Sequence, residues 1–167
     1  MDVYPDGPYG LDALQIINNM TFMGFRDGGD PFTELSLIDY YDPDGAKGIK
    51  ALFITFGWNG CGACLSQAGR MNTWETQYRS QGLRQLSALH NDLQVQDRQA
   101  RESTARDWIK RYSITYDVVI DPTYQLHNGV KPTSDPWGWL VDTKTMKITT
   151  VYPGAPGSLW GLSALLK

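Results

Sequence analysis

The chain has 167 residues, of which 41% are hydrophobic and 20% charged, so it is expected to fold as one globular domain and not to be disordered or fibrous. Its net charge of -3 gives no electrostatic basis for nucleic-acid binding, and no apolar run approaches the roughly 18 residues of a membrane span. We therefore expect neither a nucleic-acid partner nor a membrane span in this chain.

The N-terminal part predicts a surface segment followed by a β-hairpin. Residues 1–19 are rich in Pro, Gly and aromatic residues, and we treat them as a lead-in segment to a domain at residues 20–167. Within the lead-in, residues 11–18 are expected to form a helical turn or two. Residues 21–25 are expected to form a strand, and FTELSLIDYY, after the turn FRDGGDP, pairs back with it.

A buried strand is predicted next, at Ala51–Phe56, because ALFITF is almost wholly apolar and rich in β-formers. The only two cysteines of the chain, Cys61 and Cys64, follow it closely. From Cys64, apolar residues recur at helical spacing as far as Tyr78, and Gly82 is a helix stop. The two thiols therefore lie where a buried strand turns into an amphipathic helix.

The remaining elements alternate between strands and helices, which implies parallel pairing and right-handed crossovers. A Glu102–Arg106 pair is expected on the solvent side of the second helix. The closing part of the chain is expected to be an antiparallel hairpin and a final helix. In chain order, the elements are a strand at 83–89, a helix at 96–112, a strand at 116–120, hairpin strands at 137–141 and 147–152, and a helix at 158–166.

The sequence CGAC predicts redox chemistry. The first N–H groups of a helix lack partners and the helix dipole favours negative charge, so a thiolate at Cys61 is stabilised there. Cys64, nearly one turn later, points back toward the core, and the spacing brings both sulfurs within bonding reach. Cys61 would attack a substrate disulfide and Cys64 would resolve the mixed disulfide, the reverse sequence oxidising a dithiol. No cofactor is needed for this chemistry.

Three other roles are open to the cysteines. A structural zinc site needs four ligands, and the chain adds only His90 and His127, which are far apart in sequence. Copper capture by the cysteine pair and one histidine is a second alternative, because soft thiolates bind Cu(I). A simply buried, inert pair is the third. We expect no metal site.

With these elements in order, the chain resembles the thioredoxin-like superfamily, and within it exported bacterial thiol-disulfide oxidoreductases related to TlpA and ResA. The resemblance runs from about Met20 to Lys167 and rests on three stretches: ALFITFGWNGCGAC, VVIDPTYQLHNGV and SDPWGWLVDTKTMKI. It implies an α/β fold, a thioredoxin-like three-layer α/β/α sandwich with a central mixed β-sheet, an N-terminal β extension and an inserted strand–helix segment.

The resemblance also implies a substrate site. Pro136 matches the family's cis-proline, facing Cys61, with the Asp135 backbone offered to a bound peptide as an edge. An ordinary trans proline that opens a strand is the alternative. The expected substrate-binding residues are Trp58, Gly60, Asp135 and Pro136.

The chain departs from the family at several positions. Gly60 stands where relatives have Trp before the first Cys, Ala63 replaces a common Pro, and Thr55 occupies a position that often holds a buried proton-transferring residue. Because a hydroxyl is no acid or base near neutral pH, proton transfer to Cys64 would need water or another group. An Asp135 carboxylate close to the thiolate would disfavour its ionised form.

Besides the cysteines, the two histidines of the chain are candidate site residues. His90 follows a parallel strand at the carboxyl edge of the sheet, where ligands bind in open α/β sheets, so it could lie near the site; a solvated loop residue is the alternative. His127 is interpreted as a surface residue. Peroxiredoxins share this scaffold and usually have Thr three residues before the reactive Cys, where this chain has Trp58, so peroxidase activity is not expected.

The sequence thus predicts a thiol-disulfide oxidoreductase that acts on protein disulfides or dithiols. It would work with an upstream thiol-disulfide electron donor or acceptor. The alternative is a thioredoxin-fold binding module for metal or peptide with little redox turnover. The resemblance favours an exported protein, periplasmic or tethered through a removed leader, whereas the residues alone are compatible with the cytoplasm.

Overall fold

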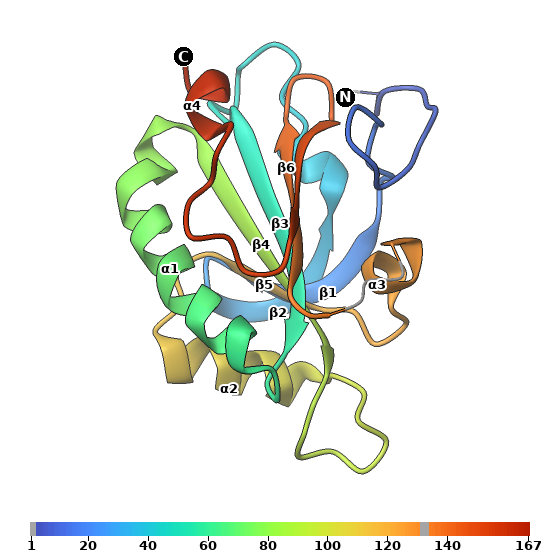
Figure 1. Cartoon of the computed structure of the whole chain (residues 1–167), viewed down its shortest axis with the longest axis vertical. Coiled ribbons are helices and arrows are strands. Elements are labelled where there is room, and N and C mark those ends of the chain that lie inside the picture. The colour runs from blue at the N-terminus through green and yellow to red at the C-terminus, as the bar shows by residue number, and fades with distance from the viewer. Residues whose placement is uncertain (1–2, 131–133) are drawn as a thin grey trace.

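The computed structural model describes residues 3–130 and 134–167, which form one seven-stranded mixed sheet with helices on both faces (Figure 1). The strand order is β2-β1-β5-β4-β3-β6-β7. The pairings β3–β4 and β4–β5 are parallel and the others are antiparallel. The strands are β1 Thr21–Arg26, β2 Gly29–Ser36, β3 Ala51–Trp58, β4 Leu83–Asn91, β5 Asp117–Ile120, β6 Trp137–Asp142 and β7 Lys147–Pro153.

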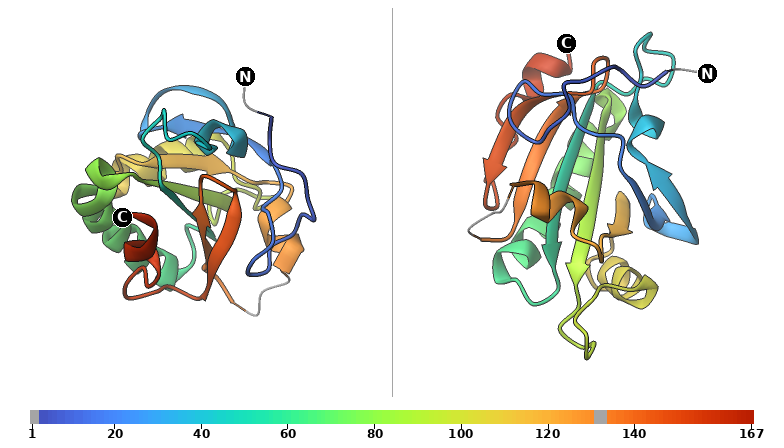
Figure 2. Two further views of the ribbon diagram at one scale, coloured as in Figure 1. Left: turned by 90° about the horizontal axis from the view of Figure 1, so that it is seen from above. Right: turned by 90° about the vertical axis from the view of Figure 1, so that its right-hand side faces the viewer.

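Two layers cover the sheet, and each has its own apolar cluster. One face packs against α1 Gly62–Tyr78, α2 Glu102–Tyr112 and the C-terminal α4 Leu162–Leu165. The other face is covered by α3 Gln125–Val130, the 3₁₀ turn η1 Leu37–Tyr40 and part of the N-terminal segment (Figure 2). This is the three-layer α/β/α sandwich with a mixed sheet that the sequence predicts. Among the described residues, no helix is long and apolar enough to cross a membrane.

Strand β3 is buried because, apart from Thr55, its sequence contains no polar side chain. Seven successive residues, Ala51 to Gly57, are buried, and the strand lies between β4 and β6. Helix α1 begins four residues after β3 ends, as its apolar spacing predicts, and a short 3₁₀ turn extends it to Gly82, whose φ of 111° ends it. The strand-to-helix junction expected around the cysteines is thus confirmed.

The prediction of a helical turn within residues 11–18 is wrong. The backbone N–H groups of Leu14 and Ile17 donate to the carbonyls of Ile148 and Met146, so they pair with the β6–β7 hairpin and not with each other. Leu14 also has φ 71°, which no helix residue adopts. Because Ile17 is fully buried, this segment packs into the cluster on the α3 face.

Two predicted helices are shorter than expected. Helix α2 begins at Glu102 and not at residue 96, because Arg98 has φ 57° and the Arg101 N–H donates to the Thr104 hydroxyl, which caps the helix there. Helix α4 covers only Leu162–Leu165 of the predicted 158–166. Gly161, with φ 95°, separates it from an irregular stretch in which Trp160 packs on Tyr152. The Glu102–Arg106 pair is confirmed, with 2.9 Å between Nη2 and Oε1.

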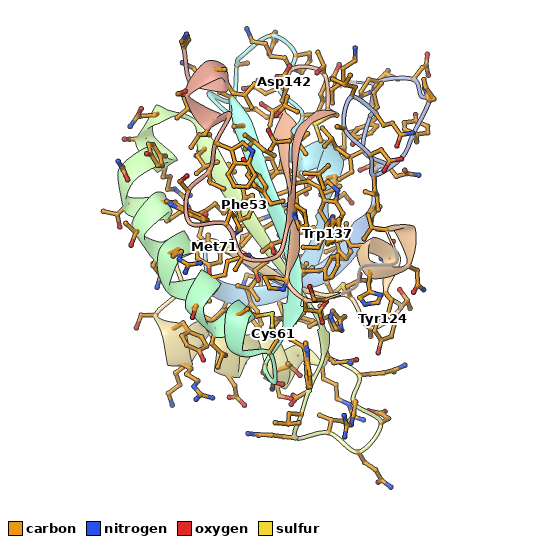
Figure 3. The ribbon with its side chains drawn as sticks, viewed as in Figure 1. Phe53, Cys61, Met71, Tyr124, Trp137 and Asp142 are labelled. Carbon is orange, nitrogen blue, oxygen red and sulfur yellow. A yellow bond between two sulfur atoms is a disulfide. The ribbon has the colours of Figure 1, made fainter. Side chains whose placement is uncertain are left out.

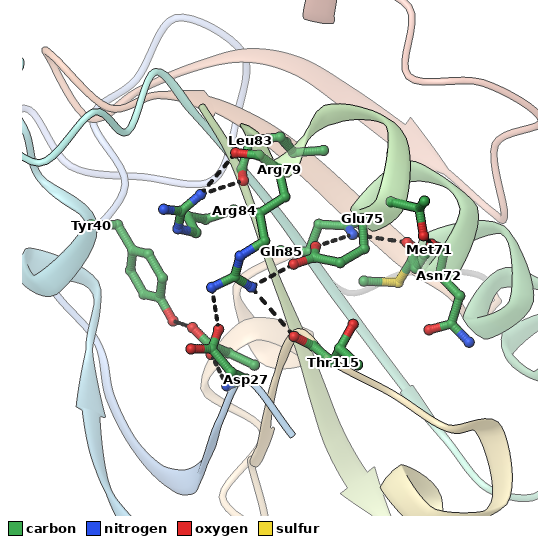
Figure 4. A network of polar contacts seen from close by, with 12 residues as sticks. Asp27, Tyr40, Met71, Asn72, Glu75, Arg79, Leu83, Arg84, Gln85 and Thr115 are labelled. Carbon is green, nitrogen blue, oxygen red and sulfur yellow. Dashed lines mark hydrogen bonds and ion pairs between the residues drawn. The ribbon is translucent and has the colours of Figure 1, made fainter. Parts of the chain in front are cut away.

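A buried polar network joins α1 to β4 at the end of the sheet away from the cysteines (Figure 4). Gln85, buried in β4, donates from Nε2 to the Met71 carbonyl at 2.9 Å and to Glu75 Oε2 at 2.8 Å. Arg79 pairs with Glu75 and with Asp27. The Arg79 guanidinium balances the charge of the buried Glu75 carboxylate, and the Gln85 hydrogen bonds tie α1 to the sheet.

Candidate active site

Cys61 and Cys64 are joined by a disulfide at the N-terminus of α1, with Cα atoms 5.2 Å apart. Cys61 is the N-cap residue, and its Sγ accepts the backbone N–H of Cys64 at 3.1 Å. Cys61 is half-buried and the two following residues are exposed, whereas only 5% of Cys64 is accessible. The site therefore has one sulfur at the surface, next to the helix N–H groups, and one beneath it.

The disulfide lies at the carboxyl end of the parallel strands, at the end of the sheet opposite Asp142 (Figure 3). The loops that follow β3 and β4 lie at this edge, as does the chain that enters β6. In open α/β sheets, ligands bind at this edge. The projecting loop between β4 and α2 borders the same edge (Figure 1).

Gly57, Cys64 and Pro136 meet beneath the disulfide. A Cβ added at Gly57 would lie 2.6 Å from Cys64 Sγ and 4.0 Å from Pro136 Cβ. Phe56 pairs with Trp137 across β3 and β6, which brings the preceding Pro136 next to Gly57. The Asp135–Pro136 peptide bond is cis, as the resemblance implies. Pro136 follows Cys64 by 72 residues in the sequence, and the fold places it beside the cysteines.

Trp58 covers Gly60 in the turn that leads to Cys61. A Cβ at Gly60 would lie 2.3 Å from the Trp58 ring, so the ring occupies the space beside the glycine. The turn is closed by the Cys61 N–H, which donates to the Trp58 carbonyl at 3.2 Å. This packing gives a structural reason for glycine at position 60: the indole of Trp58 lies over the turn and leaves no room for a side chain.

The side chain of Asn59 joins the turn before Cys61 to the loop after β4 through two hydrogen bonds. Its Nδ2 donates to Asp92 Oδ1 at 2.7 Å, and its Oδ1 accepts the Leu93 N–H at 2.8 Å. Burial alone would raise the pKa of Asp92, but hydrogen bonds from Thr104, Asn59 and the backbone outweigh it and lower the pKa below the ordinary value of 3.8. The carboxylate therefore remains ionised and keeps the turn before Cys61 in place.

His90 is buried, and the interpretation as a solvated loop residue is wrong. It belongs to β4, only 3% of it is exposed, and its Nε2 lies 3.1 Å from Asp135 Oδ2. The strand runs two residues further than predicted because Asn91 still pairs with Trp58 of β3. His90 thus holds the residue that precedes Pro136, and the Asp135 carboxylate is engaged by this imidazole.

His127, interpreted from the sequence as a surface residue, is partly exposed, and part of its ring packs against other rings. Its ring lies 5.3 Å from both the Phe56 ring and the His90 ring, between centroids, and 5.8 Å from that of Tyr124. Helix α3 is short, but it places the His127 ring against the ends of β3 and β4. Within residues 3–130 and 134–167, no group of three or more His, Cys, Asp or Glu side chains is arranged to hold a metal ion.

Sequence reasoning missed Gly57, Asn59 and Gln67 at this site. A glycine ending an otherwise apolar strand just before a cysteine pair is a signal for close approach that was available in the sequence. Gln67 lies one turn after Cys64 on the buried side of α1, where a polar residue in an apolar stripe is the corresponding signal. Asn59 has no such pattern, because its partner Asp92 is 33 residues away.

No known family profile and no curated protein sequence matches the chain. Solved structures do match it in fold. A protein assigned as thiol:disulfide interchange protein DsbE from Chlorobium tepidum has a TM-score of 0.73 at 16% identity, covering 95% of this chain and 100% of its own. The thioredoxin domain of a thiol-disulfide oxidoreductase from Bacteroides vulgatus has a TM-score of 0.61 at 16% identity, covering 85% and 89%.

A second group of similar structures consists of peroxiredoxins. The 2-Cys peroxiredoxin of Plasmodium vivax, in its reduced form, has a TM-score of 0.68 at 13% identity and covers 92% of this chain and 93% of its own. Identities this low establish the fold and not the activity. The chain has the thioredoxin-like fold that the sequence predicts.

Proposed function

We propose that this protein is a thiol-disulfide oxidoreductase in which Cys61 is the nucleophile and Cys64 the resolving thiol. The observation that supports this most directly is the position of the Cys61–Cys64 disulfide at the N-terminus of α1, with Cys61 the more accessible sulfur. On reduction, the N–H of Cys64 and the positive end of the helix dipole stabilise a Cys61 thiolate. A thiolate at the surface is the form that attacks a disulfide.

The reaction proceeds in two exchanges. The Cys61 thiolate attacks a substrate disulfide, a Cys61–substrate bond forms, and one substrate sulfur leaves as a thiolate. Cys64 then attacks Cys61, which restores the Cys61–Cys64 bond and releases the second substrate sulfur. Run backward, the same steps oxidise a substrate dithiol. The two cysteines supply both electrons in the first direction and accept both in the reverse direction.

The substrate is proposed to be a protein segment that binds across Trp58, Gly60, Asp135 and Pro136. Trp58 offers an apolar surface beside Cys61. The backbone of Asp135, a residue whose carboxylate contacts His90, offers an edge for an extended peptide. Among the similar folds, those named as thiol-disulfide exchange proteins fit this chemistry better than the peroxiredoxins do. In this chain Trp58 occupies the position three residues before Cys61, where peroxiredoxins usually have Thr.

An exported location and an upstream thiol-disulfide partner are part of the same proposal. A single catalytic disulfide in an otherwise cysteine-free chain fits an oxidising compartment, where structural thiols would be at risk of mispairing. The direction of electron flow follows from the reduction potential. A value near about -270 mV would make the protein a reductant, and one near about -120 mV an oxidant of folding proteins.

The test is insulin reduction with dithiothreitol as the electron source, followed by turbidity. Cys61→Ser is expected to abolish turnover, and Cys64→Ser to accumulate a mixed disulfide that is visible as a mass increase on non-reducing analysis. Full turnover by either variant would refute the assigned roles. If the wild-type protein also showed no turnover and formed no mixed disulfide, the binding-module alternative would replace this proposal.

A further inference from the structure

The side-chain amide of Gln67 has one hydrogen-bonding orientation. The Thr55 hydroxyl donates its only proton to the Trp137 carbonyl at 2.9 Å, so toward Gln67 it can only accept. Gln67 Nε2 donates to this hydroxyl at 2.7 Å and approaches the Met71 sulfur at 4.0 Å. The amide nitrogen is therefore used, and Oε1 is the atom left over.

Two polar atoms without a partner belong to residues that line one small cavity behind the disulfide. Gln67 Oε1, an acceptor, and Trp108 Nε1, a donor, are both buried and have no hydrogen-bond partner among the described residues. Both residues line the cavity, together with Cys64 and Ser87. Leaving such atoms unpaired costs about 1–3 kcal/mol each, so a native protein normally satisfies them.

The cavity has the size and lining of a water site. It gives the centre of a water molecule about 10 Å³ of room, close to the roughly 10–15 Å³ that one water needs. Among the described residues that line it there is no Asp, Glu, His, Lys or Arg, and Cys64 is the only titratable one. A proton that leaves Cys64 on this side therefore meets no side-chain base.

We propose that this cavity binds a single water molecule, held between Gln67 and Trp108, that solvates the sulfur of Cys64 during resolution. The water accepts from Trp108 Nε1–H and donates one hydrogen to Gln67 Oε1. Because these two bonds fix its orientation, its second hydrogen is available to the Cys64 sulfur. Gln67 and Trp108 are positioning residues that act through the water, and this inference rests on the proposed function.

The resolving step gains most from this water. The Cys64 thiol loses its proton, and the resulting thiolate forms the bond to Cys61 Sγ while the Cys61–substrate sulfur bond breaks. The Cys64 proton passes to solvent, and the substrate leaves as a thiolate that takes up a proton from solvent, so protons and electrons balance. A buried thiolate in apolar surroundings is costly, and one hydrogen bond from an oriented water reduces that cost. The first attack, by Cys61 at the surface, does not need it.

The experiment uses the reduced full-length protein and one equivalent of 5,5′-dithiobis(2-nitrobenzoate). Attack by Cys61 releases the first thionitrobenzoate, and resolution by Cys64 releases the second. Gln67→Met is expected to leave the first phase unchanged and to slow the second about fivefold, the effect of one lost hydrogen bond of about 1 kcal/mol. The midpoint of the second phase's pH profile is expected to move up by about 0.7 pH unit, which is the same factor.

Two more variants separate this effect from a loss of stability. Trp108→Phe keeps the aromatic ring and removes the N–H, and should slow the second phase in the same direction. Gln85→Met is the matched control: Gln85 is also a buried glutamine whose Oε1 has no described partner, but it lies in the Glu75 network outside this cavity. It should leave both phases unchanged.

The possible outcomes distinguish the proposed water site from the proposed function on which it rests. A slower second phase in the Gln67 and Trp108 variants, but not in the Gln85 variant, supports the water site. Equal second phases in all proteins overturn it and leave the proposed function standing, as does an equal slowing by Gln85→Met. A wild-type protein that releases no thionitrobenzoate in the first phase overturns the proposed function and the water site with it.

Discussion

Replacing Gly57 by Ala tests how closely the end of β3 approaches the disulfide. The added Cβ would lie 2.6 Å from Cys64 Sγ and 3.2 Å from Cys64 Cβ, whereas favourable contacts between nonbonded heavy atoms lie at about 3.5–4.0 Å. The strand cannot move aside, because Gly57 pairs with Leu89 on one side and its neighbour Phe56 pairs with Trp137 on the other. The sulfur must move instead.

The cost falls mainly on the oxidised protein. In the disulfide the Cys64 sulfur is fixed by its bond to Cys61, whereas in the dithiol it can rotate away from the new methyl group. Overpacking of this kind costs about 1–3 kcal/mol. With about 30 mV per 1.4 kcal/mol for a two-electron couple, the reduction potential should become less negative by about 20–65 mV.

The assay is equilibration of the wild-type protein and the Gly57→Ala variant against graded glutathione or dithiothreitol buffers. The thiols are then alkylated and the reduced fraction is read from the mass shift. Gly69→Ala is the matched control, because Gly69 lies in the same α1 helix and nothing lies within 4 Å of its added Cβ. The control should keep the wild-type potential and gain about 0.5–1 kcal/mol of stability from helix propensity. A Gly57→Ala protein with unchanged potential and unchanged stability would refute the proposed contact.

Two further predictions concern groups around the site. His90→Phe should lower the free energy of unfolding by about 1–3 kcal/mol, because it keeps the ring packing and leaves the Asp135 carboxylate without its donor. His90→Gln should lose less in urea titrations; equal stability of the Phe variant would contradict the pairing. The pKa of Asp92 is lowered in the folded state, so its contribution to stability is fully present above about pH 4 and is lost as the pH falls through the folded value. Between about pH 5 and about pH 3, wild-type protein should therefore lose more stability than Asp92→Asn, and parallel losses would count against this role.

The strands and the first helix could be predicted because the spacing of apolar residues along the chain indicates which side of each element is buried. ALFITF indicated a buried strand, and the spacing after Cys64 indicated α1, with Gly82 as its stop. The ends of helices were less predictable where side chains form hydrogen bonds with backbone N–H groups. The start of α2 depends on Thr104, and the lead-in depends on backbone partners in the β6–β7 hairpin, more than 120 residues away.

The sequence by itself determined the chemistry of the candidate site: two thiols at a spacing that allows a disulfide, at the junction of a buried strand and a helix. Only the tertiary structure decided what surrounds them. It places Pro136 beside Gly57, His90 against Asp135, and Trp108 at the cavity behind Cys64. The physical reason is that hydrogen bonds and cavities depend on which distant segments meet at the sheet edge. A local pattern records which side of an element is buried, but not which residues lie opposite it.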